Sequence, residues 1–402
     1  MLQKMMLQNR MIQTKQKQAG LLVCLLLLLC AAIAGCGQAE DSQSAAAAVE
    51  RIYQPAYATG FQITYYTDGA RLIETNIQGT SENSGRQQNI LVVPDGAQVP
   101  DGVDYDFKLD GYLTNAVTLG SAHPGHFATL GLIDCVKGVS IQAEKCFIPA
   151  LKEALENGDC VYVGSGDKMD QELIASLQPQ IIFVGGMQRD LEFAQKMEES
   201  GLFCLYFGDY AESDYMGRAQ WVELIGALTG QDEQAQAFIA DCDAGIGEIV
   251  QRAAAIEEKP KVIWFTHSSQ VPHWYLKGDT DYVGSIVHAL GAELICPETE
   301  TNSATLSNEA FVQALQEADK IVFGVSLNSY PDAADITYFN KEDQVDFAQA
   351  PAYQNGDCYV VSNDWAQTTS DVLEIIKSAA ICLYPEEFAD LGEATKIDKF
   401  VK

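Results

Sequence analysis

Imidazole and aromatic side chains gather in three short segments, each of which follows an apolar run. The first segment, SAHPGHF, carries His123 and His126 three positions apart. Two imidazoles at this spacing could ligate a metal or cover the face of a large chelate. No cysteine or carboxylate stands at a fixed spacing beside them, so simple loop hydrogen bonding explains the pair equally well.

The second segment, WFTHSSQVPHWYLKGDTDY, is the densest in rings. It carries Trp264, His267, His273, Trp274 and Tyr275. Rings at this density suit a flat or bulky ligand that is held by contact area and a few polar groups. Trp264 is equally well explained as an ordinary core residue of the strand. His273, Trp274 and Tyr275 follow Pro272 among polar residues, which favours contact with a ligand.

The third segment, SNDWAQTTSD, places Trp365 between an apolar run and a predicted helix. An exposed tryptophan is costly without a partner, which favours a ligand contact here. Tyr330 and Arg189 hold similar strand-end positions and are weaker candidates for ligand contact. In a two-lobed α/β protein the loops that follow strands meet at the crevice between the lobes, so we expect these residues to share one binding site.

No catalytic motif accompanies these segments. GxSxG, HExxH and the GxxxxGK[ST] loop are all absent from the sequence, and each is the signature of a known reactive arrangement. We therefore expect a binding protein and not an enzyme, with no resident cofactor and no resident metal.

The composition is that of a folded chain with a strongly acidic surface. Of 402 residues, 47% are hydrophobic and 20% are charged, and the formal net charge is −31. A field of this sign repels phosphate backbones, so nucleic acid is excluded as a partner. We expect the chain to act as a monomer. The cysteines contain no CxxC pair, and their disulfide state stays open.

The N-terminus has the pattern of an export signal. Residues 1–20 carry four cations and no acid, and an apolar run follows from Leu21 to Ala34. This run is shorter than the roughly 20 residues that a membrane-spanning helix needs. The next segment, IAGCG, resembles the lipobox of bacterial lipoproteins, which implies lipidation of Cys36. We expect a signal peptide over 1–35, a lipidated tether over 36–55, and a chain held on the outer face of the cell membrane or in the periplasm.

Beyond the tether the hydrophobic pattern changes twice. Residues 56–114 show short alternating runs between turn signals, which predicts a small antiparallel β extension. Residues 115–212 and 259–390 alternate apolar strands with helices, which predicts two Rossmann-like lobes with mostly parallel sheets. Residues 213–258 are predicted to be a helical linker with one long backbone helix. The expected fold class is α/β.

In order and spacing, these segments resemble the helical-backbone (class III) periplasmic binding proteins, the solute-binding lipoproteins of ABC importers for iron-siderophore, haem or cobalamin. The matching pieces are VTLGSAHPGHFATLGLIDCVKGVS, MDQELIASLQPQIIFVGG, ESDYMGRAQWVELIGALTG, GSIVHALGAELI, SNEAFVQALQEADKIVF and APAYQNGDCYVVS. The resemblance implies that a metal chelate is captured between two lobes and delivered to an ABC permease. It also implies a membrane attachment through the lipid.

The same resemblance implies that carboxylates on the two lobes contact the permease. Glu309 matches the acid of the C-terminal lobe, whereas Gly125 stands at the position that we match to the acid of the N-terminal lobe. Docking through Glu309 is therefore expected, and the second contact stays open.

The identity of the ligand is left open among several classes. Strand-end loops offer few cations, so a strongly anionic tris-catecholate complex is less favoured than a neutral hydroxamate-type iron complex, haem or a corrinoid. An iron-siderophore is preferred because iron complexes are the commonest cargo of the family. The alternatives are a receptor for bare zinc or manganese with a similar architecture, a chelatase-like enzyme, and a purely structural surface lipoprotein.

Overall fold

The computed structural model describes residues 47–77, 86–186, 188–268, 271–296, 303–341 and 345–401. The predictions for the signal peptide, for the lipidated Cys36 and for most of the tether lie outside these residues. Within the described ranges, no helix combines the length and the apolar content that a membrane crossing requires. Ala46–Lys402 form one compact unit, and the sheets described below all belong to it.

The first sheet has the strand order β1-β2-β3-β4-β5. Its strands are β1 (Val49–Tyr53), β2 (Phe61–Tyr66), β3 (Arg71–Ile77), β4 (Arg86–Val93) and β5 (Phe107–Asp110). Strands β1 to β4 pair antiparallel, whereas β4 and β5 pair parallel. This N-terminal sheet is therefore larger than the antiparallel unit expected over 56–114, because β1 forms from residues that we assigned to the tether.

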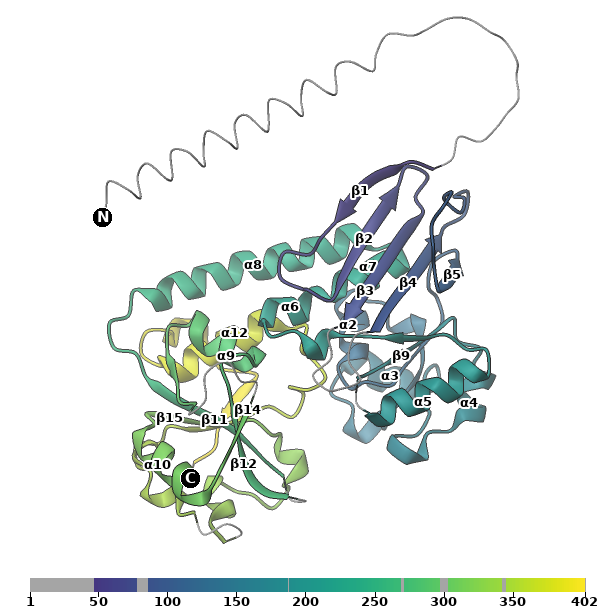
Figure 1. Ribbon diagram of the computed structural model, residues 1–402. Coiled ribbons are helices and arrows are strands. Elements are labelled where there is room, and N and C mark those ends of the chain that lie inside the picture. The colour runs from purple at the N-terminus through teal and green to yellow at the C-terminus, as the bar shows by residue number, and fades with distance from the viewer. Residues whose placement is uncertain are drawn as a thin grey trace, which may run out of the picture. The chain divides into compact units, whose positions relative to one another are not determined.

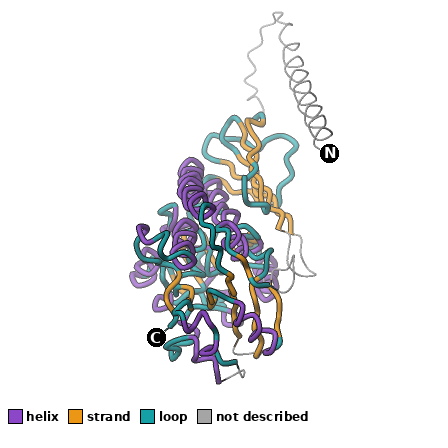
Figure 2. Tube along the Cα trace, turned by 90° about the vertical axis from the view of Figure 1, so that its left-hand side faces the viewer, coloured by secondary structure: helices purple, strands orange, loops and turns teal. Residues whose placement is uncertain are grey.

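Alternation along these strands separates a buried face from a polar face. Phe61, Ile63 and Tyr65 of β2 are buried, and β2 and β3 contact helix α7 (Val222–Thr229). The ring of Trp221, just before α7, meets Phe61 edge to face with centroids 5.2 Å apart. Figure 2 shows helices, in purple, beside the strands of this sheet. The extension thus shares the main core of the protein.

The N-terminal sheet also covers the edge of the next sheet. The Gln88 side chain of β4 donates to the Cys204 carbonyl at 2.7 Å and accepts from the Tyr206 amide at 2.9 Å. Phe107 stacks on Phe203 beside these bonds, with ring centroids 4.2 Å apart. An outer strand that would otherwise present unpaired backbone groups is protected in this way.

The second sheet is fully parallel, in the order β10-β9-β6-β7-β8. Its strands are β6 (Ala116–Thr118), β7 (Val136–Val139), β8 (Val161–Tyr162), β9 (Ile181–Val184) and β10 (Cys204–Tyr206). The helices between them are α2 (His123–Thr129), α3 (Pro149–Asn157), α4 (Gln171–Ser176) and α5 (Gln188–Glu199). Strands β9 and β10 are buried throughout, as a parallel sheet covered on both faces requires. We call this sheet with its helices the N-lobe.

Three helices follow the N-lobe: α6 (Tyr215–Gln220), α7 and α8 (Asp232–Ala254). Gly230 caps α7 in a left-handed conformation with φ 75°, which allows the sharp turn into α8. Helix α8 has 23 residues and extends about 35 Å. It packs against α7 and against α12 (Val372–Leu383) (Figure 1). The predicted long backbone helix is confirmed.

The third sheet has the order β14-β12-β11-β15-β16-β17, with β13 beside β11. Its strands are β11 (Lys261–Ser268), β12 (Val271–Lys277), β13 (Glu293–Leu294), β14 (Ser303–Leu306), β15 (Lys320–Phe323), β16 (Cys358–Val361) and β17 (Ile397–Lys399). Its helices are α9 (Tyr282–Ala289), α10 (Asn308–Glu317), α11 (Pro351–Gln354) and α12. We call this sheet with its helices the C-lobe.

The C-lobe sheet is mixed. Strands β13, β11, β15 and β16 run parallel, whereas β12, β14 and β17 pair antiparallel with their neighbours. Strand β17 pairs with β16 and carries the sheet past residue 390, where we expected the lobe to end. The α/β fold with two lobes joined by a long helix is confirmed.

Candidate functional site

A hollow of about 530 Å³ opens at the carboxyl ends of the N-lobe strands, and C-lobe residues close its other side. Its walls come from the loops after β6, β7, β9, β10 and β16, together with α6 and the start of α9. The side chains that shape it are His123, Asp190, Asp209, Tyr210, Arg218, Tyr282, Trp365 and Thr369. This is the crevice where α/β proteins bind ligands, and its volume lies in the range of small-molecule sites.

The two imidazoles of α2 lie at different depths beneath this hollow. His123 lines it and is 3% exposed, whereas His126 is fully buried. The Gly120 amide donates to Nδ1 of His123 at 3.2 Å. Burial lowers the pKa of His123 to about 4. This imidazole is therefore neutral at neutral pH, with its proton on Nε2.

His126 is the partner of a buried carboxylate. Its Nε2 lies 3.3 Å from Oδ2 of Asp209. Burial raises the pKa of Asp209, but the hydrogen bond to His126 and the nearby His126, His123 and Arg218 side chains together lower it by more, so that this pKa lies below its ordinary value. The carboxylate is thus held in its charged form. Of the two histidines, only His123 is placed to touch a ligand.

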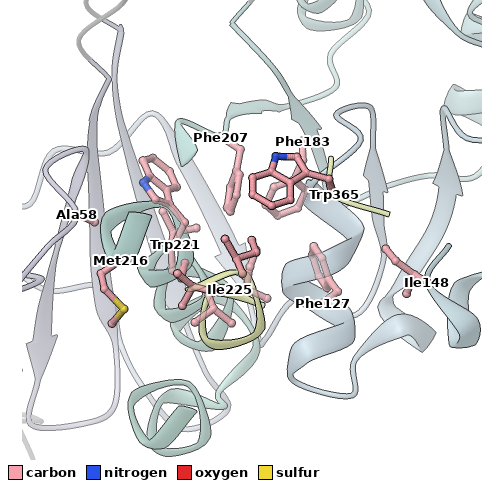
Figure 3. Close-up of a cluster of buried hydrophobic side chains, with 14 of the residues drawn as sticks. Ala58, Phe127, Ile148, Phe183, Phe207, Met216, Trp221, Ile225 and Trp365 are labelled. Carbon is pink, nitrogen blue, oxygen red and sulfur yellow. The ribbon is translucent and has the colours of Figure 1, made fainter. Parts of the chain in front are cut away.

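Rings and one cation form the opposite wall. The Trp365 indole N–H donates to the Tyr282 hydroxyl at 2.7 Å, and the Arg218 guanidinium carbon lies 3.9 Å from the centroid of the Tyr282 ring. Arg218 Nε donates to the Asp209 carbonyl at 3.1 Å. Trp365 also belongs to the buried cluster around Phe207 that Figure 3 shows. The wall offers flat apolar area and one oriented positive charge.

Beside the hollow, residues 364–370 of the C-lobe reach across to the N-lobe, and we call this segment the clasp. The Gln367 side chain accepts from the Phe147 amide at 2.9 Å and donates to the Lys145 carbonyl at 2.8 Å. The hydroxyls of Thr129 and Ser370 lie 3.0 Å apart. The two lobes are therefore joined by direct hydrogen bonds next to the candidate site.

Lys396 holds the clasp in place from within the C-lobe. Its Nζ lies 2.7 Å from an Asp364 oxygen and 3.0 Å from an Asp371 oxygen, and it donates to the Thr368 hydroxyl at 2.9 Å. Burial lowers the pKa of Lys396, but the two carboxylates raise it by more, so that this pKa lies above its ordinary value. Trp365 thus sits on a segment that is fixed at both ends.

The segment richest in rings does not form a loop. After β11 the chain turns back as β12, which pairs antiparallel with β11 and places His267 opposite Trp274. Trp274 is fully buried, stacks on Phe311 with ring centroids 4.3 Å apart, and donates to Oδ1 of Asn308 at 3.2 Å. The prediction that Trp274 contacts a ligand is therefore wrong, because alternation along β12 directs its side chain into the core.

His267, Tyr330 and Trp264 are buried in the C-lobe as well. The Tyr330 hydroxyl donates to the His267 carbonyl at 3.1 Å, and neither residue lines the hollow. Trp264 lies behind Trp365, with ring centroids 5.8 Å apart. Trp264 is thus a core residue that supports a site residue, and His267 and Tyr330 pack the interior of the lobe.

Three other predicted residues are not brought to the hollow by the described structure. Tyr275 is half-buried on β12 and does not line the hollow. The side chains of Arg189 and His273 lie outside the described part of the chain. Sequence reasoning missed Tyr282 and Arg218, although Tyr282 ends the ring-rich segment directly after Asp281, a residue type typical of a helix N-cap.

Glu309 is exposed and is the second residue of α10. The Ser307 side chain caps this helix by accepting from the Ala310 amide at 3.3 Å. Hydrogen bonds from its own backbone amide and from Ser307 hold the pKa of Glu309 below its ordinary value. Helix α10 leads into β15, which pairs with β11, the first strand of the C-lobe sheet.

The N-lobe repeats this arrangement in α4. Glu172 is exposed and is the second residue of α4. The Asp170 side chain caps this helix by accepting from the Leu173 amide at 2.9 Å. Helix α4 leads into β9, which pairs with β6, the first strand of the N-lobe sheet. Glu172 and Glu309 therefore hold equivalent positions. Gly125 is buried in α2, and a Cβ there would approach the Gln367 carbonyl to 2.3 Å, so an exposed acid does not fit at this position.

Metal and thiol chemistry find little support in the described ranges. There, no three His, Cys, Asp or Glu side chains come together as a cage for a metal ion. Seven of the described cysteines are free thiols: Cys135, Cys146, Cys160, Cys204, Cys242, Cys358 and Cys382. The alternative of a receptor for bare zinc or manganese gains nothing from this part of the structure.

A family model described as periplasmic binding protein matches residues 131–364, which is more than half of the chain. The chain therefore belongs to the periplasmic binding protein family, and its two lobes joined by α8 are of the helical-backbone (class III) type. Proteins of this family bind a small solute and work with an ABC transporter.

Similar proteins are known from bacteria and archaea. The uncharacterized lipoprotein MJ0872 of Methanocaldococcus jannaschii is 23% identical to this chain over 244 residues. The matched region covers 60% of this chain and 61% of MJ0872, so the chain spans about three-fifths of the length of that relative. A periplasmic binding protein of Veillonella parvula superposes with a TM-score of 0.58 at 15% identity, over 79% of this chain and 93% of its own. S. aureus IsdE, solved with haem, superposes with a TM-score of 0.54 at 14% identity, over 67% of this chain and 99% of its own. These similarities show a shared fold.

Proposed function

We propose that this chain is the extracytoplasmic receptor of an ABC importer and captures a metal chelate in the hollow between its lobes. An iron-siderophore is the first candidate, and haem and a cobalamin-like corrinoid are the others. The observation that carries the proposal is the wall of Trp365, Tyr282 and Arg218, which faces the strand-end loops of the N-lobe. Such a wall suits a flat or bulky ligand.

Charge narrows the choice of chelate. Arg218 is the one cation among the described residues that line the hollow, and Asp190 and Asp209 line it too. A strongly anionic complex needs several cations around it, so a neutral or weakly anionic complex fits better. His123 carries its proton on Nε2, because Nδ1 accepts from Gly120. Its Nδ1 lone pair is therefore already used and cannot ligate a metal, which favours an iron complex whose own oxygens already fill the metal sphere.

The test is a binding panel read by tryptophan fluorescence. We expect one of ferrioxamine B, haemin and cyanocobalamin to bind one-to-one and to change the emission of the protein. Trp365→Ala should weaken that binding by about tenfold to a hundredfold, since a buried aromatic contact contributes roughly 1.5–3 kcal/mol. The matched control is Trp264→Phe, which alters a ring behind the wall. Tight retention of naked Zn²⁺ or Mn²⁺, or no binding at all, would contradict the proposal.

We also propose that Glu172 and Glu309 both contact the permease. Their equivalent places on capped helices of the two lobes support this proposal. In it, Glu172 has the role of the N-lobe acid that the family resemblance implies, in place of Gly125. Glu172→Lys and Glu309→Lys should each reduce uptake strongly while the ligand affinity of the purified protein stays unchanged. Glu153→Lys, at another exposed acid of the N-lobe, is the control. Lost ligand binding in either variant would show that the acid is misassigned.

Attachment through Cys36 completes the proposal. The extracytoplasmic location agrees with the family and with the lipoprotein relative, and the lipid would keep the receptor near its permease. Cys36→Ser should move the protein from the membrane fraction to the soluble fraction after cell lysis. A variant that stays in the membrane fraction would argue for another attachment.

A further inference from the structure

The N-terminal sheet carries a second hollow, of about 490 Å³. It lies over β2, β3 and β4 and is bordered by the connection between β1 and β2, residues 54–60. None of its lining residues belongs to the interlobe hollow. Its volume is within the usual range of small-molecule sites, and the proposed import function does not use it.

Two cross-strand rows of polar side chains form the floor of this second hollow. Gln62, Glu74 and Asn89 lie side by side on β2, β3 and β4, and Asn76 lies opposite Gln87 in the next row. Gln62 Nε2 donates to Glu74 Oε2 at 2.7 Å, which orients the carboxylate. Asparagine is depleted in strands, so Asn76 on β3 and Asn89 on β4 are not what sheet formation alone would select.

The rim of the second hollow is fixed from beneath by two groups. The Glu212 carboxylate, only 6% exposed, accepts from the amides of Thr59 and Gly60 at 2.9 and 3.0 Å. The Gln220 side chain, 2% exposed, accepts from the two amides that precede Thr59, at 2.8 and 2.9 Å. A rim held by such bonds is preorganised, which lowers the entropy lost when a ligand binds.

The chemistry of the lining selects the ligand class. Its polar side chains are five amides (Gln54, Gln62, Asn76, Gln87 and Asn89), Glu74 and two threonines, and none of the described lining residues is Lys, Arg or His. An anion would meet Glu74 and a net charge of −31 without a compensating cation. Amides offer donors and acceptors side by side, and a carboxylate only accepts. Hydroxyl groups, which do both, match this mixture, whereas carbonyl groups would oppose Glu74.

We propose that the second hollow binds a neutral polyhydroxylated ligand, a saccharide. The hydroxyls donate to Glu74 and exchange hydrogen bonds with Asn76, Gln87 and Asn89. The receptor then has two binding sites of different chemistry: rings and one cation between the lobes, and amides with one carboxylate on the N-terminal sheet.

Calorimetric titration of the full chain tests this proposal. The probes are the hexasaccharides of β-1,4-glucose, α-1,4-glucose, β-1,4-mannose, β-1,4-xylose and β-1,4-N-acetylglucosamine. We expect at least one to bind saturably, and Glu74→Ala and Asn89→Ala each to weaken it about tenfold or more, because each removes hydrogen bonds in a partly buried site. Glu50→Ala is the matched control, since Glu50 is an exposed acid of β1 outside the lining.

Thermal unfolding of every variant shows whether it is folded, and Gln62→Ala replaces any variant that is not. Heat from none of the five saccharides would overturn the proposal. Binding that survives unchanged in the Glu74, Asn89 and Gln62 variants would overturn it as well, because the saccharide would then lie elsewhere. Neither result would bear on ligand capture between the lobes, which the fluorescence panel tests separately.

Discussion

The two lobes use the chain after their first strand in opposite ways. In the N-lobe, the chain after β6 turns at Gly120 and opens onto the hollow, and the ring of His123 packs so closely that a Cβ at Gly120 would approach it to 2.3 Å. In the C-lobe, the chain after β11 pairs back as β12, and Trp274 fills the interior. A segment with rings after a strand therefore lines the hollow in the N-lobe, whereas in the C-lobe the segment pairs back as a further strand and its rings enter the core.

Removing the ring that the C-lobe buries tests this difference between the two lobes and should give the largest effect. Trp274→Ala should lower the free energy of unfolding by about 3–5 kcal/mol, because a fully buried stacked indole leaves a cavity. The affinity of the folded fraction for the chelate should not change. Urea unfolding and the fluorescence titration measure the two effects, and a large loss of affinity with unchanged stability would return Trp274 to the binding site.

The acid side of the stability curve tests the buried imidazole of the N-lobe. The pKa of His123 in the folded chain is about 4, below its ordinary value of 6.5, so the unfolded chain binds the proton more strongly. The stability that depends on neutral His123 is thus complete above pH 6.5 and is lost as the pH falls towards 4, by up to about 3 kcal/mol.

His123→Gln should flatten the pH dependence of unfolding between pH 6.5 and 4. The matched control is His288→Gln, at an exposed histidine of α9. Urea unfolding at several pH values measures both. An equal slope in His123→Gln and in the unchanged chain would show that His123 is not the group that titrates.

A smaller effect is expected at the clasp, where the lobes meet. Gln367→Ala removes two hydrogen bonds to the N-lobe backbone and should cost about 1–3 kcal/mol, since the Phe147 amide and the Lys145 carbonyl lose their partners. The variant should also show a wider spread of distances between spin labels placed on the two lobes. Gln313→Ala, at an exposed site on α10, is the control. An unchanged distance distribution would show that other contacts hold the lobes together.

Most of the fold could be predicted from the sequence, because strand and helix periodicities differ and the long linking helix has an uninterrupted pattern. The boundaries of the small sheet could not, since β1 carries the polar-looking VERIY, which becomes a strand only by pairing with β2. Strand β12 was missed because HWYLK was interpreted as a loop, although Trp274 and Leu276 alternate with more exposed neighbours.

The hollow lies where loop position predicts a binding site, and only some of the predicted residues line it. His123 and Trp365 follow strands directly and line the hollow, as loop position suggests. Arg218 and Tyr282 stand on helices, so no strand-end argument reaches them, and only the tertiary packing brings their side chains together. The equivalence of Glu172 with Glu309 likewise becomes visible only when the two sheets are compared strand by strand.

Hydrogen exchange with and without the bound chelate, followed by mass spectrometry, shows where on the protein the chelate lies. With whichever chelate of the fluorescence panel binds, we expect slower exchange at the strand-end loops 119–123 and 209–210 and at the clasp. The hairpin of β11 and β12 and the floor of the second hollow should exchange at unchanged rates. Protection confined to the hairpin, with none at residues 119–123 or at the clasp, would show that the chelate does not bind in the hollow between the lobes.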